Sequence, residues 1–272
     1  MIILVLVVLG LAFGSFVNAL VWRVHKQSTV KKSLRSKYSI STGRSMCTHC
    51  GHGLAVKDLI PVLSWLWLRG KCRYCHKRID DNPLAELLTP FLFVVSYLFW
   101  PLSWSTEGKV LFGFWLVLVV GLVALFIYDL RWLLLPNRIV FPLFGVAASQ
   151  FVLQLLFGGG WQVVITSFWG VVVGGGIFWI IFQFSDGKWI GGGDVKLGWL
   201  LGALVGGPLQ SLLLLFIASL LGTLVSGPLL IMGKANRKTH LPFGPFLIAS
   251  GAIVYLFGSG LIVWYKHLVG FY

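Results

Sequence analysis

The 272 residues are 57% hydrophobic and only 11% charged, with a formal net charge of +14. Apolar runs of roughly 20 residues recur along the chain, and each can cross a hydrocarbon core of about 30 Å. A soluble domain is not built in this way. The runs also lack the alternation of polar and apolar residues that an outer-membrane barrel requires. The composition therefore predicts an all-α, polytopic bundle of membrane-spanning helices.

Eight apolar segments are expected to span the membrane. In chain order they cover residues 1–22, 84–104, 110–128, 138–157, 161–183, 195–206, 209–232 and 244–264. The sixth is short for a full crossing, so we expect it either to tilt or to continue toward Pro208. The first has no signal-peptide cleavage site followed by a soluble domain, and we interpret it as a retained helix. Three glycine pairs have the spacing that lets helices approach closely. They are Gly10 and Gly14, Gly170 and Gly174, and Gly202 and Gly206.

Positive charge is concentrated in the one long polar stretch, residues 23–82. Thirteen of the 22 Lys and Arg residues lie between Arg23 and Arg78. If this stretch is cytoplasmic and the spans alternate, the inner segments carry 20 basic residues and the outer ones only Lys109 and Lys266. The positive-inside rule therefore predicts a cytoplasmic position for this stretch. Anionic membrane lipids are a sufficient partner for its charge, and the pattern does not indicate nucleic acid.

All four cysteines lie in this stretch, in two CxxC motifs. The motifs are Cys47-x2-Cys50 and Cys72-x2-Cys75. Paired motifs of this kind predict one tetrahedral zinc held by four thiolates, and Gly51 and Gly70 allow tight bends beside them. Disulfides are the alternative, which a reducing cytosol disfavours. A closed site leaves no position for water, so we expect a structural role. Three histidines are possible substitute ligands: His49, His52 and His76.

These patterns predict three parts. Residues 1–22 form the first transmembrane helix, residues 23–82 a small, basic, cytoplasmic zinc-binding domain, and residues 83–272 a transmembrane bundle. A domain as small and basic as the second has little apolar core, so metal binding is expected to supply much of its folding free energy.

Two isolated acids stand at the ends of apolar runs. Asp129 ends one run, and Asp194 follows three glycines just before another. A carboxylate at membrane depth is costly and is kept mainly where it has a function. Each acid has an ordinary alternative, because Asp194 could cap a helix and Asp129 could pair with Arg131. Both fall on the cytoplasmic side in the topology derived from Lys and Arg, so the two can meet at one depth.

A pair of facing carboxylates suits peptide hydrolysis. The two cannot easily both ionise, so together they hold one proton. The ionised member can deprotonate a water while the protonated one polarises a peptide carbonyl. Lys196 would favour the ionised form of Asp194 if its ammonium group faces that carboxylate. Asp186 looks solvated in a turn and is a weaker candidate for the pair than Asp129 and Asp194. The three glycines are expected to let an extended substrate approach closely. They are Gly191, Gly192 and Gly193.

Further motifs follow in order along nearly the whole chain. They are Gly14-Ser15-Phe16-Val17-Asn18 with Arg23, Arg44-Ser45-x-Cys47, Ile60-Pro61-Val62-Leu63-Ser64-Trp65, Arg69-Gly70-Lys71-Cys72, Glu86, Asp129-Leu130-Arg131 with Pro136-Asn137, and Leu241-Pro242-Phe243-Gly244-Pro245. Together with the Gly-Gly-Gly-Asp stretch, they resemble the bacterial type IV prepilin peptidases, which are GxGD-type intramembrane aspartyl proteases.

This resemblance implies that Asp129 and Asp194 are the catalytic aspartates. It implies cleavage after a Gly, between the basic leader and the hydrophobic helix of prepilins or pseudopilins, at the cytoplasmic face of the bacterial inner membrane. Many members also N-methylate the new N-terminus with S-adenosylmethionine and carry the four-cysteine element. No GxGxxG motif follows a strand, so the sequence does not locate a methyl-donor site. It does not predict an oligomeric state either.

The sequence departs from the family pattern at two places. Asp81-Asn82 precedes Pro83 where many members have Arg-Tyr, and the aspartyl motif has a small second residue where a bulkier one is common. The first difference bears on substrate or methylation details more than on hydrolysis. Glu86, at the cytoplasmic end of the second span, is a candidate to hold a positive group of the leader or the new amine. Alternatively, it is an acid favoured by the start of a helix.

Two other functions compete with this interpretation. An ion- or proton-coupled membrane transporter could use Asp129 and Asp194 as its ion site, because intramembrane acids and broken helices are typical of transporters. That function leaves the cysteine motifs and the glycines before Asp194 unexplained. A scaffold with a zinc adaptor leaves both acids unexplained.

Overall fold

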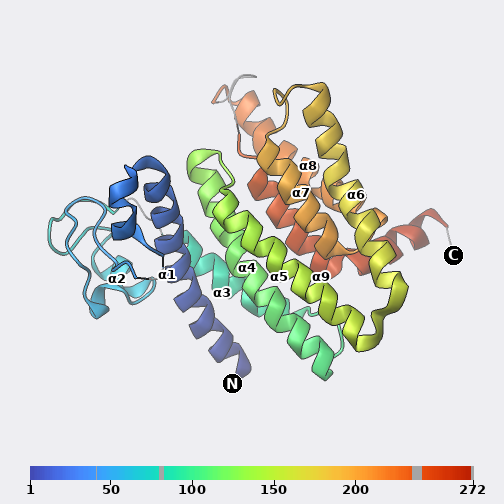
Figure 1. The fold of residues 1–272 in the computed structure, drawn as a ribbon, viewed down its shortest axis with the longest axis horizontal. Coiled ribbons are helices and arrows are strands. Elements are labelled where there is room, and N and C mark those ends of the chain that lie inside the picture. Colours follow the sequence, from blue (N-terminus) through green and yellow to red (C-terminus); the bar gives the residue numbers. More distant parts are fainter. Residues whose placement is uncertain (41, 80–82, 235–240, 271–272) are drawn as a thin grey trace. The chain divides into compact units, whose positions relative to one another are not determined.

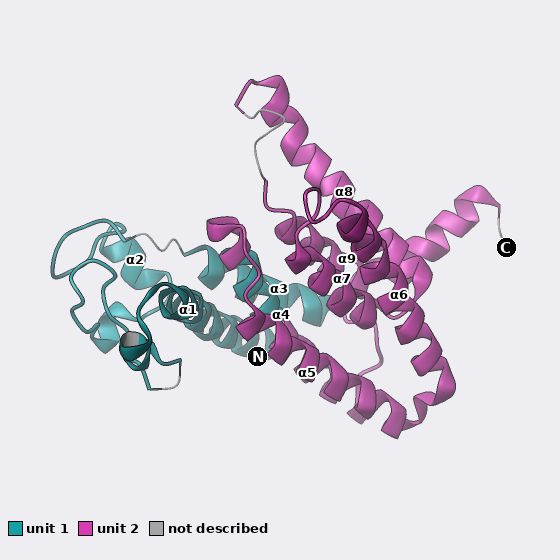
Figure 2. Cartoon of the chain, turned by 45° about the horizontal axis from the view of Figure 1, so that its top comes forward, with its two compact units in different colours: residues 1–98, 119–127 teal, residues 99–118, 128–272 magenta. Residues whose placement is uncertain are grey.

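The structure is a computed structural model, and it describes residues 1–40, 42–79, 83–234 and 241–270 (Figure 1). Within these residues the secondary structure is helical, with two isolated β-bridges and no strand. The expected all-α fold is therefore confirmed. The chain divides into two compact units (Figure 2). The first is Met1–Leu98 with Val119–Ile127, and the second is Phe99–Leu118 with Tyr128–Tyr272.

In the first unit, helix α1 (Ile2–Thr29) packs against helix α3 (Leu84–Leu98). The glycines of α1 make this contact possible. A Cβ atom added to Gly14 would lie 2.5 Å from the backbone of Glu86, and one added to Gly10 would collide with the backbone of Pro90. The first glycine pair therefore allows the close helix approach that the sequence predicted.

The polar stretch is anchored to the end of α1. This helix continues to Thr29, seven residues past the expected end of the first span. The buried Arg23 donates to the carbonyls of Ile40 at 2.9 Å and Gly43 at 2.8 Å, and Gln27 donates to the carbonyl of Tyr38 at 2.6 Å. Short helices then follow. They are the 3₁₀ helices η1 (Lys32–Tyr38) and η2 (Val56–Asp58) and the α-helix α2 (Leu63–Trp67).

The second unit is built around a short central helix, α7. The larger elements are α5 (Asn137–Gln154), α6 (Gly160–Phe184), α7 (Gly192–Val205), α8 (Pro208–Ile231) and α9 (Gly244–Val269), and α4 (Thr106–Trp132) contributes to both units. Helix α7 packs against α5, α6, α8 and α9 (Figure 1). Its apolar residues Leu197, Leu200 and Leu201 are fully buried, so α7 carries much of the core.

Glycines bring α6 and α7 into direct backbone contact. A Cβ atom added to Gly174 would lie 2.9 Å from the carbonyl oxygen of Gly198, and one added to Gly202 would collide with the carbonyl of Gly170. Gly206 has a different role, because it ends α7 in the left-handed conformation at φ 72° with open space around it. These contacts fix the register of α7, whose first turn carries Asp194.

Each of the eight expected spans coincides with a helix, and five helical stretches in the described residues are long and apolar enough to cross a membrane. One of the five is α5 and α6 together, which meet at a kink in Leu155–Gly159, where Gly158 has φ 96°. Helices α3 and α7, with 15 and 14 residues, are shorter. At about 1.5 Å per residue, α7 does not cover a hydrocarbon core of about 30 Å. The membrane character is confirmed, and the count of eight crossings stays a prediction.

Candidate active site and metal centre

Asp129 lies in the last turn of α4 and is only 5% exposed. The helix ends at Leu133, which adopts the left-handed conformation at φ 53°, and Pro136 cannot continue it. The Asp129 carboxylate accepts a hydrogen bond from the backbone N–H of Gly244, at the start of α9. A Cβ atom added to Gly244 would lie 2.6 Å from Asp129 Oδ2. The acid is thus held against the backbone of Gly244 so closely that a side chain at that position would require the carboxylate or the backbone to shift.

Asp194 is the third residue of α7, and Gly191 is the N-cap of that helix. The acid is therefore not itself the cap. Its half-buried carboxylate reaches back and accepts a hydrogen bond from the backbone N–H of Gly191. The beginning of a helix carries a partial positive charge, so each acid lies where a helix start favours a carboxylate.

The structure brings Asp129 and Asp194 together. Their carboxylates are close enough to interact electrostatically, although 65 positions separate them in the sequence. The alternative of an N-cap role for Asp194 does not hold, because Gly191 is the N-cap of α7. The Arg131 guanidinium lies over the ring of Trp132, 5.9 Å from its centroid.

The other residues predicted near the pair have specific neighbours. A Cβ atom added to Gly193 would meet the Leu135 side chain at 3.1 Å, whereas Gly191 is exposed. Lys196 Nζ donates to Asn137 Oδ1 at 2.9 Å and lies 5.9 Å from the centroid of the Phe141 ring. Its described contacts are therefore with α5. The second residue of the motif, Gly192, has the Phe182 ring 3.6 Å from the position of an added Cβ atom. Asp186, at φ 48°, lies in an exposed turn, as expected.

The four cysteines form one cluster in the first unit. Their sulfur atoms all lie within 4.8 Å of one another, with Cys47 Sγ and Cys75 Sγ 3.9 Å apart. Four sulfurs at about 2.3 Å from a tetrahedral zinc are about 3.8 Å apart. All four are free thiols, so the disulfide alternative does not hold in this structure. The cluster therefore has the composition and the dimensions of a metal centre.

Two similar turns shape this cluster. The N–H of Cys47 donates to the carbonyl of His52, and the N–H of Cys72 donates to the carbonyl of Lys77, both at 2.9 Å. The isolated bridges Met46–Gly53 and Lys71–Arg78 close the two turns. Burial raises the pKa of the Cys47 thiol, but hydrogen bonds with the backbone of Cys50 and His49 outweigh burial and lower it to about 7. Such a thiol is readily deprotonated by a metal.

The nearby histidines are not part of the metal cluster. The ring of His52 packs on Tyr74 with centroids 3.8 Å apart, and His49 Nε2 lies 3.0 Å from the carbonyl oxygen of Arg78. Asp58, which the sequence did not single out, links the second turn to η2. Its carboxylate accepts from Arg73 Nε at 2.6 Å. Burial raises the pKa of Asp58, but hydrogen bonds from Arg73, the Ala55 N–H and Tyr74 outweigh it and lower the pKa.

Glu86 is held by two hydrogen bonds in the first turn of α3. Oε2 accepts from the Val62 N–H at 2.6 Å, and Oε1 accepts from Asn18 Nδ2 at 3.5 Å. Asn18 and Gly244 are the neighbours of site residues to which the sequence gave no role. Both lie in motifs that carried the resemblance, but their partners are distant in sequence. The departure at Asp81-Asn82 lies outside the described residues.

Two family models match this chain. Residues 8–100 match the family described as bacterial peptidase A24 N-terminal domain, and residues 116–227 match the type IV leader peptidase family. The first match contains the cysteine cluster and Glu86, and the second contains Asp129 and Asp194.

Several curated proteins are similar to this chain over most of their length. A prepilin leader peptidase/N-methyltransferase of Aeromonas salmonicida is 31% identical over 276 residues, which cover 94% of this chain and 91% of that protein. The protein of the same name from Pseudomonas putida is 34% identical, covering 97% and 93%. A type 4 prepilin-like proteins leader peptide-processing enzyme of Escherichia coli is 33% identical, covering 91% of each. No solved structure gives a significant match.

These matches confirm the resemblance that the sequence motifs indicated. The chain belongs to the type IV leader peptidase family.

Proposed function

We propose that this protein cleaves the leader peptide from prepilins or pseudopilins, after a Gly, with Asp129 and Asp194 as the catalytic pair. The observation that carries the proposal is the approach of two carboxylates from separate helix ends, each held by a backbone N–H. The names of the relatives, which are leader peptidases, support the choice of substrate.

The pair can hydrolyse a peptide bond without a covalent intermediate. Two close carboxylates share one proton, because both cannot easily ionise. The ionised one takes a proton from water as the water oxygen bonds to the peptide carbon. The protonated one gives its proton to the carbonyl oxygen. Collapse of the tetrahedral intermediate then breaks the C–N bond, and the leaving nitrogen takes a proton from the carboxyl group that gained one from water. One hydroxyl of the intermediate returns its proton to the other carboxylate as the C=O bond reforms, so the pair again holds one proton.

The surrounding residues have proposed roles in substrate binding. Gly191, Gly192 and Gly193 provide a backbone without side chains in front of Asp194. Gly191 is the member best placed for contact with substrate, because it is exposed. Lys196, which donates to Asn137, positions the start of α5 beside α7. Glu86 is proposed to hold a positive group of the leader or the new amine.

We propose that zinc occupies the cluster of Cys47, Cys50, Cys72 and Cys75. The free thiols within 4.8 Å of one another suit a closed four-thiolate site with a structural role. The zinc would fix the polar stretch, residues 23–82, which has few buried apolar residues of its own. This stretch and the transmembrane bundle that follows it are the proposed domains.

The second proposed activity is N-methylation of the newly exposed amine, which the names of several relatives include. S-adenosylmethionine supplies a methyl group on a positively charged sulfur. The lone pair of the neutral amine bonds to the methyl carbon, the electron pair of the C–S bond stays on sulfur, and a proton leaves the product ammonium to water. A free α-amine has a pKa of roughly 7.7–8.0, so a neutral fraction is available at cytosolic pH.

The site is proposed to lie at the cytoplasmic face of the bacterial inner membrane. The distribution of basic residues supports this side. A prepilin has a basic cytosolic leader and an apolar membrane helix, so a catalytic pair at this boundary meets the junction directly.

Mass spectrometry of a prepilin treated with the purified protein tests the proposal. We expect one cut after the Gly at the leader junction and, with S-adenosylmethionine present, one added methyl group on the new N-terminus. An intact prepilin would contradict the peptidase function. Cleavage without methylation under saturating donor would refute only the second activity.

A further inference from the structure

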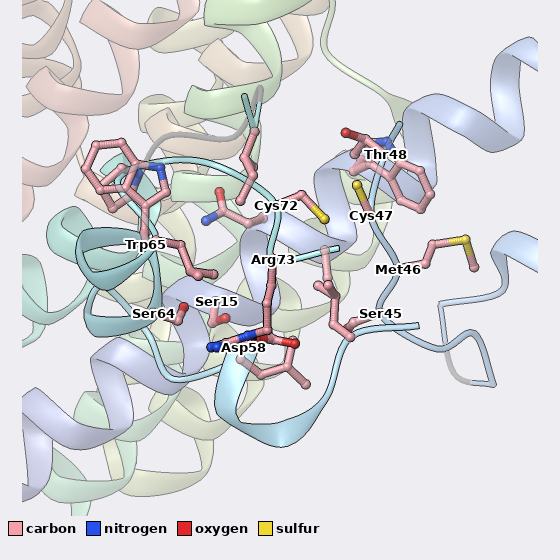
Figure 3. Close-up of a pocket in the computed structure, with 18 of the residues that line it drawn as sticks. Ser15, Ser45, Met46, Cys47, Thr48, Asp58, Ser64, Trp65, Cys72 and Arg73 are labelled. Atoms are coloured by element: carbon pink, nitrogen blue, oxygen red, sulfur yellow. The ribbon is translucent and has the colours of Figure 1, made fainter. Parts of the chain in front are cut away.

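Helix α2 has its apolar face on the outside. Leu63, Leu66 and Trp67, whose spacing puts them on one side of a helix, are 62%, 57% and 87% exposed. The residues between them, Ser64 and Trp65, line a cavity on the opposite side (Figure 3). A helix that faces water shows the reverse arrangement, with its polar residues outside and its apolar residues inside. The exposed side of α2 is therefore suited to an apolar environment.

The exposed apolar surface continues beyond α2. The 3₁₀ helix η2 packs against α2, and its first residue, Val56, is 85% exposed. A soluble protein exposes large apolar side chains singly, whereas a group of them marks a surface that meets a membrane or another protein. The members of this group are here named the outer apolar face. They are Val56, Leu59, Ile60, Leu63, Leu66 and Trp67.

The start of α2 is tied to the membrane-spanning part of the first unit. Val62, the N-cap of α2, donates its N–H to Glu86 Oε2 at 2.6 Å, in the first turn of α3. The same carboxylate accepts from Asn18 of α1. Asn18 lies inside the run expected to span the membrane, residues 1–22, and α1 is long and apolar enough to do so. Helix α2 therefore begins at the depth where that span ends.

The backbone conformation at this point is specific. Val62 has φ 60°, and a β-branched residue is rarely found there. Such a conformation persists only where its surroundings fix it, and the hydrogen bond to Glu86 is one such constraint. The depth of α2 is thus set together with that of α3.

Basic side chains border the outer apolar face. Lys57 lies in η2, Arg69 and Lys71 follow α2, and all three are exposed. The one acid of η2 and α2, Asp58, is already paired with Arg73 at 2.6 Å. Leu and Trp on one side with Lys and Arg beside them are typical of segments that lie in the interface of a membrane. Basic residues at that level attract anionic headgroups.

We propose that η2 and α2 form an interfacial anchor, in which the outer apolar face enters the leaflet next to the polar stretch. Lys57, Arg69 and Lys71 bind the phosphate groups of anionic phospholipids there. That leaflet is the cytoplasmic one in the proposed topology. The polar stretch is then attached to the bilayer surface between α1 and α3, and the second cysteine turn, which begins at Lys71, lies at that surface.

Lipid quenching of one fluorescent residue tests the depth of α2. The chain has 13 Trp residues, so an environment-sensitive fluorescent amino acid replaces Trp67 and is excited separately. The full chain is placed in bilayer discs of phosphatidylcholine and phosphatidylglycerol. We expect strong quenching by nitroxide groups on the acyl chains and weak quenching by iodide in the water, because the probe lies below the headgroups.

The matched control carries the same fluorescent amino acid in place of Ser36. Ser36 is exposed in η1, which is bonded to Gln27, beyond the expected end of the first span. This position should show the opposite pattern, with strong quenching by iodide and weak quenching by the acyl-chain nitroxides. An unchanged melting temperature shows that each labelled protein is folded.

A second comparison tests the basic residues. Nitroxide-labelled phosphatidylglycerol and nitroxide-labelled phosphatidylcholine are added in equal amounts to separate phosphatidylcholine discs, and the anionic lipid should quench the probe at position 67 more strongly. Arg69→Gln combined with Lys71→Gln should reduce this preference by up to about fivefold for each charge removed, and added salt should reduce it too. Lys32→Gln combined with Lys37→Gln, in η1, is the matched control and should leave it unchanged.

Three results at position 67 would overturn the proposal. Quenching by iodide without quenching by lipid would place the outer apolar face in water. Quenching by neither would show that protein covers it. Lipid quenching that saturating prepilin abolishes would assign the face to the substrate. Equal quenching by the two labelled lipids would overturn the role of Lys57, Arg69 and Lys71 in binding anionic headgroups.

Discussion

The contact between Gly244 and Asp129 leads to a specific prediction about catalysis. Replacing Gly244 with Ala places a methyl group 2.6 Å from Asp129 Oδ2 and 3.2 Å from its Cγ. Ordinary van der Waals contact begins at 3.4 Å, so the carboxylate must move by about 0.8 Å or the start of α9 must shift. Either change also disturbs the hydrogen bond that the Gly244 N–H donates to Asp129.

A displacement of this size at a reacting group has a large effect on rate. Misplacement by about 1 Å can cost about 10²-fold, so we expect Gly244→Ala to cleave a prepilin about 10²-fold more slowly than the wild type. The effect should fall on kcat, because the substitution acts on the reacting carboxylate and leaves the glycines before Asp194 in place.

Initial rates of prepilin cleavage by purified protein measure this effect. Gly260→Ala is the matched control, because Gly260 is in the same helix and has open space around it. The control should cleave at the wild-type rate, since Ala also has the higher helix propensity. If folded Gly244→Ala protein cleaves within about twofold of the wild type, a rate loss far below that of a 1 Å misplacement, the reasoning from this contact is wrong.

Two further predictions concern stability. Elemental analysis should give about one zinc per chain. The Cys72→Ser variant should lose this zinc, and its first unit should unfold, because Cys72 is buried and completes the thiolate set. A full zinc content in this variant would contradict the site. Gly202→Ala should destabilise the second unit by about 1–3 kcal/mol, measured by thermal unfolding, because its methyl group would collide with the carbonyl of Gly170. Gly113→Ala, with open space around it, is the control, and equal melting temperatures would refute the packing.

The position of the candidate site was predictable because it depends on local signals. The positive-inside pattern indicated one side for both aspartates, and Pro136 marked where α4 had to end soon after Asp129. The spacing of the cysteines predicted their cluster, since two CxxC turns present four sulfurs in a nearly fixed arrangement.

The partners of the site residues were not predictable. Most of these helices are apolar on all sides, so their hydrophobic pattern does not indicate which face packs against which neighbour. The contact of Asp129 with Gly244 therefore left no signal in the sequence. The same holds for the part-buried hydrogen bond from Gln150 Nε2 to the Tyr255 hydroxyl at 2.9 Å, and for the Trp115 ring stacked 4.0 Å from Tyr255.

The helix ends were predicted less well than the helices. Helix α1 continues to Thr29 because Arg23 and Gln27 find backbone carbonyls in the polar stretch, which an apolar pattern cannot reveal. The expected break between α5 and α6 at residues 158–160 is confirmed, because Gly158 at φ 96° and Gly160 at φ 56° depart from helical geometry.

The most direct measurement is prepilin cleavage by Asp129→Asn and Asp194→Asn proteins. Asn cannot exchange a proton as a carboxylate does, so each variant should lose at least about 10²–10⁴ in rate while remaining folded and loaded with zinc. Asp186→Asn is the control, because Asp186 is exposed in a turn, and it should cleave normally. Cleavage by Asp194→Asn at the wild-type rate would contradict the assignment of the catalytic pair.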